Sequence, residues 1–334
     1  MKMHDGEIDI DESLVERLVR ARFPRFAGLP VRAFRSTGTV NAVFRLGDEW
    51  CVRLPRLAGW ARALEREARW LPELGPRLPL RVPEVAAVGE PSAEFGWTWA
   101  IYRWLDGSPY DDAIAGGEER AAADLADFVH ALRALPVTGD EPRAGRRPLR
   151  DLDESTRAAI AQIGPGAEAA LAAWRAALTA PAWDGAPVWI HTDLLRPNLL
   201  VRDGRLAAVL DFGGVGAGDP AADVVPAWSV FGPAGRAIYR RALGVDEGTW
   251  QRARGYALHQ AALIIPYYSS TNPRFAEQAR RTVAEVIGDF LAERRALARE
   301  IYCGQLPVPE VQCAAVGIGA HRRSRHVNRG PSSL

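Results

Sequence analysis

The chain has 334 residues, of which 48% are hydrophobic and 25% are charged, and these are ordinary values for a globular protein with an ample core. Its formal net charge of +1 gives no electrostatic reason to bind nucleic acid or a membrane surface, so we expect neither partner. The 3 cysteines lack zinc-site or disulfide spacing, and no apolar signal segment or membrane span is visible, so we expect a cytoplasmic protein.

The N-terminal hundred residues predict a small sheet with few helices. A short amphipathic helix is expected over residues 9–22, where apolar side chains recur at helical spacing. Three strand-like runs follow at 31–38, 42–47 and 49–56. A helix is expected at 59–74, and two further strands at 82–91 and 96–107. Short turns join the first three strands and predict an antiparallel meander. We assign residues 1–103 to an N-terminal lobe.

The rest of the chain predicts a mainly helical second lobe over residues 104–302. Helical patterns cover 121–136, 153–163, 167–179 and, with breaks, 220–302. Strand-like segments at 186–194 and 199–212 interrupt them, and the second folds back at an Asp-Gly turn. Residues 303–334 lack periodicity and predict a disordered tail. The overall pattern predicts the α+β fold class.

Four polar residues stand among apolar neighbours in "WIHTDLLRPNLLVRDGRLAAVLDFGG": His191, Asp193, Asn198 and Asp211. An aspartate that accepts a proton from a hydroxyl, with an asparagine and a second aspartate that hold a divalent metal, suits phosphoryl transfer from a nucleoside triphosphate. A hairpin between Asn198 and Asp211 would bring both metal-binding groups to one end. The alternative is a set of unrelated caps and turn residues.

The spacing from Asp193 to Asn198, followed by Asp-Phe-Gly, is that of the catalytic and metal loops of kinases. Together with "GVGAGDPAADVVPAW", it closely resembles the aminoglycoside phosphotransferase family, which are small-molecule kinases with a protein-kinase-like fold. The resemblance covers roughly residues 30–295. It implies a bilobal fold with an N-terminal nucleotide-binding lobe and a C-terminal catalytic and substrate lobe. It also implies Mg²⁺, with ATP or GTP as co-substrate.

The resemblance implies a role for each polar residue of the segment. Asp193 would be the catalytic base, and Asn198 and Asp211 would be the Mg²⁺ ligands. His191 would complete the catalytic motif by holding the loop. Asp223 would either anchor that loop, which we favour, or face the substrate.

The N-terminal lobe offers a loop that could cover phosphates. Ser36, Thr37 and Gly38 begin the "STGTVN" turn, whose small residues would let backbone N–H groups approach a nucleotide. The alternative is an ordinary hairpin turn. The family's inter-lobe hinge matches "YRWLDG", where backbone groups near Arg103 and Leu105 would meet the adenine.

The third strand departs from the family pattern, because Arg53 stands where a lysine is expected and the chain's single lysine, Lys2, lies outside this region. Glu67 on the following helix is the expected partner, and Glu65 is the second candidate. Arginine keeps the charge and can bind phosphate through two N–H groups. The alternative is a surface ion pair of little energetic value.

The acceptor site is less clearly marked. The segment 264–273 is expected to break the late helices, with Tyr267, Tyr268 and Asn272 facing the cleft, although tyrosines packed on the core would fit equally well. A polycationic aminoglycoside would need an acid-lined pocket, and the acidic residues of this region do not cluster in the sequence.

The sequence therefore predicts an ATP- and Mg²⁺-dependent kinase that phosphorylates a hydroxyl of a small molecule, with antibiotics among the candidates. Kinases of choline, homoserine or fructosamine type are one alternative. A nucleotide-binding regulator with weak catalysis is another, suggested by Arg53 and by the glycine-poor loop. A metal hydrolase built on His191 is less favoured, because it would need more ligands. The sequence leaves the oligomeric state open.

Overall fold

The computed structural model describes residues 8–34, 41–111 and 117–303, with the side chains of 300–303 excepted. Its contacts divide the chain into two compact units, Met1–Ala292 and Glu293–Leu334, and the candidate site lies in the first. The expected phosphate loop of Ser36, Thr37 and Gly38 lies outside the described residues. The tail expected beyond residue 303 lies outside them as well.

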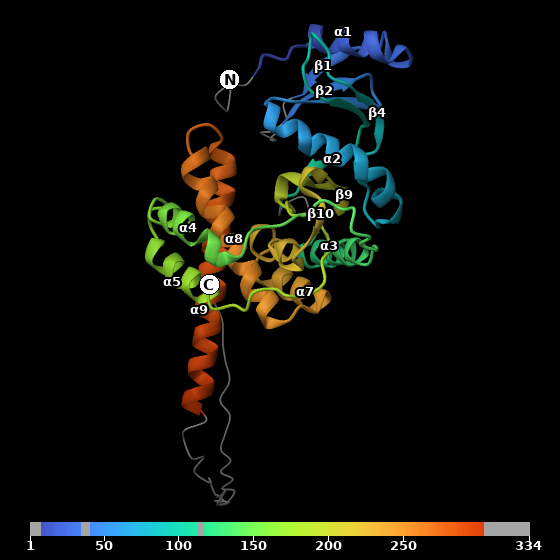
Figure 1. Cartoon of the computed structure of the whole chain (residues 1–334). Coiled ribbons are helices and arrows are strands. Elements are labelled where there is room, and N and C mark those ends of the chain that lie inside the picture. The colour runs from blue at the N-terminus through green and yellow to red at the C-terminus, as the bar shows by residue number, and fades with distance from the viewer. Residues whose placement is uncertain (1–7, 35–40, 112–116, 304–334) are drawn as a thin grey trace, which may run out of the picture. The chain divides into compact units, whose positions relative to one another are not determined.

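The N-terminal region is a five-stranded antiparallel sheet with the strand order β1-β2-β3-β5-β4 (Figure 1). The strands are β1 Val31–Phe34, β2 Asn41–Leu46, β3 Trp50–Pro55, β4 Val85–Gly89 and β5 Trp99–Arg103, with α1 Glu12–Arg22 before them and α2 Ala58–Leu74 between β3 and β4. The predicted meander and the two later strands are confirmed. Asp11 begins α1 by accepting a hydrogen bond from the Leu14 N–H.

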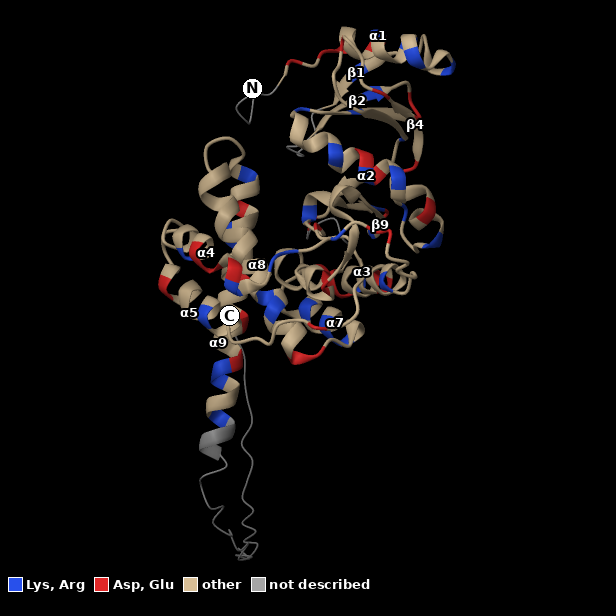
Figure 2. Cartoon of the chain, viewed as in Figure 1, with Lys and Arg blue, Asp and Glu red and all other residues tan. Residues whose placement is uncertain are grey.

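The two faces of this sheet pack against different helices. Val52 and Ile101 point into a core shared with α1, whereas Cys51 and Tyr102 belong to the core that includes α2. This division follows from the alternation of side chains along a strand. Basic and acidic residues alternate along α2, as Figure 2 shows.

The C-terminal region of unit 1 is mainly helical. Its helices are α3 Glu118–Arg133, α4 Asp153–Ile160, α5 Ala167–Ala177, α6 Pro226–Ser229, α7 Pro233–Leu243, α8 Glu247–Tyr268 and the first part of α9 Pro273–Cys303. Two small antiparallel sheets interrupt them, one of β6 Ser108–Pro109, β8 Leu199–Arg202 and β9 Arg205–Val209, the other of β7 Val188–Ile190 and β10 Gly216–Gly218. Our sequence analysis missed β6 and β10, because two or three residues carry no periodicity.

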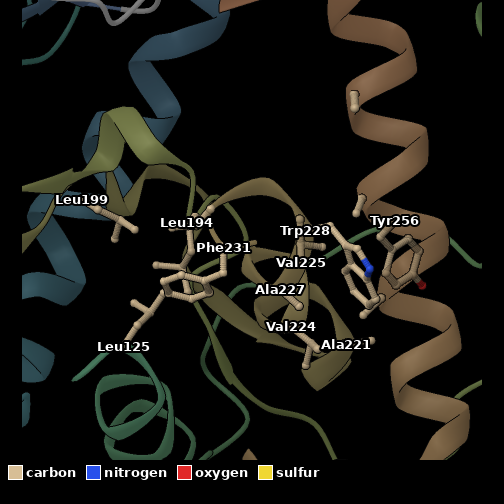
Figure 3. Close-up of a cluster of buried hydrophobic side chains, with 14 of the residues drawn as sticks. Leu125, Leu194, Leu199, Ala221, Val224, Val225, Ala227, Trp228, Phe231 and Tyr256 are labelled. Carbon is tan, nitrogen blue, oxygen red and sulfur yellow. The ribbon is translucent and has the colours of Figure 1, made fainter. Parts of the chain in front are cut away.

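Buried aromatic and aliphatic side chains hold these elements together (Figure 3). Leu125 of α3 lies near Phe231, while Trp228 lies near Tyr256 of α8. These residues belong to one continuous core that also contains Leu194, directly after the candidate catalytic aspartate. The loop that carries the site is therefore anchored in the core.

The segment 264–273 was expected to break the late helices, and the break lies within it, at residues 269–272 between α8 and α9. Helix α8 itself continues to Tyr268, with Pro266 inside its last turns. Pro266 is exposed, and a helix near its end loses little when one N–H is missing. Asn272 accepts a hydrogen bond from the Phe275 N–H at 3.2 Å and so begins α9. Among the described helices, none combines the length and apolar character needed to cross a membrane.

Candidate active site

Strand β7 leads directly into the candidate catalytic loop, and Asp223 holds the start of that loop. The two carboxylate oxygens of Asp223 accept hydrogen bonds from the N–H groups of His191 and Thr192, each at 2.8 Å. Thr192 has φ 76°, a left-handed conformation that a branched residue rarely adopts, so the loop needs this support. Asp223 is 0% exposed. It therefore anchors the loop, as favoured, and the substrate-facing alternative is wrong.

His191 connects the catalytic loop to the segment that carries Asp211. Its Nδ1 accepts a hydrogen bond from the Asp193 N–H at 3.2 Å, and its Nε2 lies 3.1 Å from the Leu210 carbonyl. Accepting at Nδ1 assigns the proton to Nε2, which then donates to Leu210. Burial lowers the pKa of His191, which favours this neutral form. The ring packs edge-on against Phe212, with centroids 4.6 Å apart.

Asp193 lies between two side-chain amides. Asn198 Nδ2 donates to its Oδ2 at 2.8 Å and to its backbone carbonyl at 2.9 Å, while Gln260 Nε2 of α8 donates to its Oδ1 at 3.3 Å. Burial raises the pKa of Asp193 to about 6, with a further increase from the nearby charge of Asp211. The charge of Arg146 and the two amides act in the opposite direction. Sequence analysis missed Gln260 and Arg146, because neither belongs to a local motif.

The hairpin predicted between Asn198 and Asp211 is confirmed. Strands β8 and β9 pair in antiparallel register, and the Leu210 N–H donates to the Asn198 carbonyl at 2.8 Å. Asp211 follows directly in a left-handed conformation with φ 63°. Gly213 lies beneath α2, where an added Cβ would be 2.9 Å from the Ala63 Cβ. The hairpin therefore brings the two candidate metal ligands to one end, close to α2.

The donor set at this end fits a magnesium ion. Asn198 uses its amino group for Asp193, which leaves its carbonyl oxygen for another partner. The charge of Asp211 raises the pKa of both Asp193 and Glu67, and a divalent cation here would relieve this unfavourable interaction. The described residues contain no cluster of three or more His, Cys, Asp or Glu side chains arranged around a metal. A site of few protein oxygens suits Mg²⁺, which keeps phosphate and water ligands.

Arg53 and Glu67 form the expected ion pair, with Arg53 Nη1 donating to Glu67 Oε1 at 2.6 Å. The Glu67 side chain is 1% exposed, and its Oε2 has no hydrogen-bond partner in the described part of the protein. Burial raises the pKa of Glu67 to about 7, and Arg53 opposes that change. The arginine also lies 5.1 Å from the centre of the Tyr102 ring. Glu65, the second candidate, instead accepts a hydrogen bond from Thr98.

The hinge residues differ in what they offer a nucleotide. The Arg103 N–H already donates to the Glu84 carbonyl at 2.9 Å, and its side chain lies 3.5 Å from both Glu49 and Glu84. Leu105 is buried against Leu200, and within the described residues its backbone groups make no hydrogen bond. The backbone groups of Leu105 therefore keep their hydrogen-bonding capacity, unlike the N–H of Arg103.

Tyr267 and Tyr268, which were predicted to face the cleft, lie at the end of α8. Tyr267 is 59% exposed and packs edge-on against Tyr268, which in turn contacts Phe275. Along α8, Tyr267 lies two turns, or about 10 Å, beyond the residue that contacts Asp193. That residue is Gln260, so an earlier turn of the same helix faces the catalytic loop.

Comparison with known proteins agrees with this geometry. The model of the phosphotransferase enzyme family (APH) matches residues 31–256. The GDP and kanamycin complex of APH(2")-IIia is 19% identical, covers 82% of this chain and 98% of its own, and has a TM-score of 0.66. The structure of macrolide 2'-phosphotransferase MphH from Brachybacterium faecium is 23% identical in sequence. The match covers 82% of this chain and 97% of that protein, with a TM-score of 0.54.

A search of curated protein sequences finds no match. The similar structures share the α+β fold of kinases, and the family model spans both the sheet with Arg53 and the loops with Asp193 and Asp211. The chain belongs to the phosphotransferase enzyme family and is a small-molecule phosphotransferase of the kinase type.

Proposed function

We propose that the protein transfers the γ-phosphoryl group of ATP or GTP to a hydroxyl of a small molecule that lies against Asp193. The observation that carries this proposal is the position of Asp193. Its carboxylate is half-buried, is oriented by Asn198 and Gln260, and lies within electrostatic reach of Asp211. A fixed acidic oxygen beside candidate metal ligands is what in-line transfer to a hydroxyl requires.

Asp193 orients the acceptor hydroxyl and takes its proton as the oxygen bonds to the γ-phosphorus and the bond to the nucleoside diphosphate breaks. Its pKa of about 6 keeps the carboxylate ionised near neutral pH, yet raised enough to hold a transferred proton. Mg²⁺ held by Asn198 and Asp211 would neutralise charge on the triphosphate. His191 and Asp223 act on the loop backbone and do not contact the reacting atoms.

Arg53 would bind the nucleotide phosphates in the place where other members of the family use lysine. Its Nη1 is held by Glu67, while the guanidinium has four further N–H donors. The position near Asp211 supports this role, because the charge of Asp211 acts on both Arg53 and Glu67. Arginine can bind phosphate through paired donors, so the replacement preserves the charge and changes only the shape.

The experiment is to incubate the protein with Mg²⁺ and ATP, and separately GTP, and a panel of aminoglycosides, macrolides, amino alcohols and hydroxy acids. Mass spectrometry detects an added phosphoryl group. Asp193→Asn should lower turnover at least about 100-fold, because general base catalysis contributes that much or more. Asp203→Asn is the matched control, since Asp203 lies exposed at the turn of the β8–β9 hairpin.

Nucleotide binding without any product across the panel would favour the alternative of a regulator with weak catalysis. Equal turnover by wild type and Asp193→Asn would contradict the role of Asp193.

A further inference from the structure

A cavity of about 690 Å³ lies beside α8, within the size range of small-molecule sites. Its walls come from residues 137–150, from the connection 178–187, from the end of β10 and from α8. The charged residues among the described lining are Arg143, Arg146, Arg147, Arg150, Arg252, Glu141 and Asp219. The walls therefore carry more positive than negative charge.

Both carboxylates of the cavity already have partners. Glu141 accepts hydrogen bonds from the N–H groups of Thr138 and Gly139 at 2.7 and 2.8 Å. Asp219 binds Arg252 through both oxygens, at 2.9 and 3.2 Å. Neither carboxylate neutralises the remaining arginines of the cavity.

The side chains of the other four arginines, Arg143, Arg146, Arg147 and Arg150, make no ion pair or hydrogen bond within the described residues. Arg146 is the most informative of them, because its Nε is buried and has no hydrogen-bond partner there. A buried donor without a partner is costly in the free protein, and an anionic ligand would satisfy it. The positions of basic residues along the chain can be followed in Figure 2.

The segment that carries these arginines is fixed beside the catalytic loop. The Ala144 N–H donates to the Ala217 carbonyl at 3.0 Å, and the Ala217 N–H donates to the Pro142 carbonyl at 2.9 Å. Gly145 adopts φ 92°, and an added Cβ would lie 3.2 Å from the Ile190 side chain. Ile190 is the last residue of β7 and directly precedes the catalytic loop. Arg146, which follows Gly145 in the chain, therefore lies near the start of that loop.

Helix α8 joins the cavity to the catalytic aspartate. Tyr256 lines the cavity, and Gln260, one turn later on the same helix, donates to Asp193. Arg146 lies within electrostatic range of the Asp193 carboxylate. Burial lowers the pKa of His259, which lies between Tyr256 and Gln260 in the helix, and the charges of Arg146 and Arg147 lower it further. The part of α8 that lines the cavity therefore lies one helical turn from the residue that contacts Asp193.

We propose that the phosphate acceptor is a hydroxylated small molecule with a carboxylate or phosphate group, which Arg146 binds in this cavity while the hydroxyl lies at Asp193. This inference rests on the proposed phosphotransferase function and names the substrate class of the same site. A polycationic acceptor would place its charges against four unpaired arginines, whereas an anion would neutralise them. Arg143 and Arg147 are exposed, and they attract the anion at the entrance.

The test compares probes that share one open-chain polyol skeleton and differ in charge: D-gluconate, D-glucitol and D-glucamine, with inorganic phosphate as a simple anion. Calorimetry without nucleotide measures binding to wild type, Arg146→Gln and Arg146→Lys. Gluconate and phosphate should bind better than the other two probes. Arg146→Gln should weaken their binding roughly 10- to 100-fold, since hydrogen bonds to charged groups are of that strength, and Arg146→Lys should restore part of it.

Arg175→Gln is the matched control, because Arg175 lies exposed on α5 outside the cavity and the net charge changes equally. Absence of gluconate and phosphate binding, equal binding of glucamine, or binding unchanged in Arg146→Gln would each overturn the anion site. Phosphorylation assays distinguish the two proposals. If phosphoryl transfer to cationic acceptors requires Asp193 but is unchanged in Arg146→Gln, this inference alone is overturned. Arg146-dependent anion binding without transfer to any acceptor would overturn the kinase function.

Discussion

The nucleotide side and the acceptor side of this site differ in how their charges are satisfied. On the nucleotide side, Arg53 is paired with Glu67, and the catalytic loop is tied to Asp223. On the acceptor side, four arginines line a cavity without an ion pair among the described residues. Paired charges fix a geometry before any ligand binds, whereas unpaired charges leave binding energy for the ligand. The difference indicates that the groups on the nucleotide side are held in place in the free protein. The arginines on the acceptor side gain partners only when the acceptor binds.

The largest expected effect is at the anchor of the catalytic loop. Asp223→Asn keeps the size of the side chain but offers one acceptor where two N–H groups now donate. We expect a loss of about 3 kcal/mol in the free energy of unfolding, because a buried donor loses its partner. Turnover should fall at least about 100-fold, because displacement of the loop moves Asp193. Chemical denaturation and single-turnover kinetics measure the two effects.

Asp289 provides the matched control, because it also accepts from buried arginines but lies on α9, away from the catalytic loop. Asp289→Asn should cost stability with little change in turnover of the folded fraction. If Asp223→Asn kept full turnover, the fixed geometry of the nucleotide side would not depend on this carboxylate.

A second test asks whether the Arg53–Glu67 pair contributes charge or shape. Arg53→Gln leaves Glu67 buried without a cation, so we expect a loss of about 3 kcal/mol in stability and roughly a 10-fold rise in the nucleotide KM. Arg53→Lys keeps the cation, so its nucleotide KM should stay within roughly 3-fold of wild type. Steady-state kinetics with varied nucleotide measure both variants.

An unchanged nucleotide KM in folded Arg53→Gln would show that this pair is structural only. A large loss in Arg53→Lys would instead show that the planar guanidinium is required.

The smallest expected effect is a pH dependence on the acceptor side. Burial, with help from Arg146 and Arg147, lowers the pKa of His259 from its ordinary 6.5 to about 4. The unfolded chain therefore takes up this proton more readily, and stability should fall as the pH decreases from about 6.5 to about 4. We expect this residue to contribute about 1–2 kcal/mol to the fall, allowing for partial solvent screening.

Denaturation curves across this pH range should show a shallower slope for His259→Gln than for wild type. Its partner Thr156 can still donate to the Leu152 carbonyl, so the variant should keep its fold. Equal slopes would mean that His259 does not contribute to the pH dependence of stability, and would remove this evidence for the contrast between the two sides.

Local patterns were enough to predict most of the nucleotide side. The β8–β9 hairpin follows from its Asp-Gly turn, and it alone brings Asn198 and Asp211 together. Glu67 could be selected as the partner of Arg53 because helical spacing places it on the face that turns toward the sheet. Asp223 was recognised as a possible anchor, but its burial settled the role.

The acceptor side was not predictable in the same way. The contact of Gln260 with Asp193 was not predicted, because Gln260 stands in a helical stretch without a local motif. Arg146 lies in a segment that reads as an ordinary loop. Its position depends on backbone pairing with β10, a strand too short to be recognised.

The sequence by itself determined the reaction class, because a base, two metal ligands and a hairpin turn lie within one short segment and act over short chain distances. Only the tertiary structure decided which charges face the acceptor. Arg146 and Gln260 come from separate segments more than a hundred residues apart in the chain. The Arg146 segment is held by backbone pairing with β10, and Gln260 reaches Asp193 from α8. Side chains from such distant segments meet only when the core is formed, so no local pattern records them.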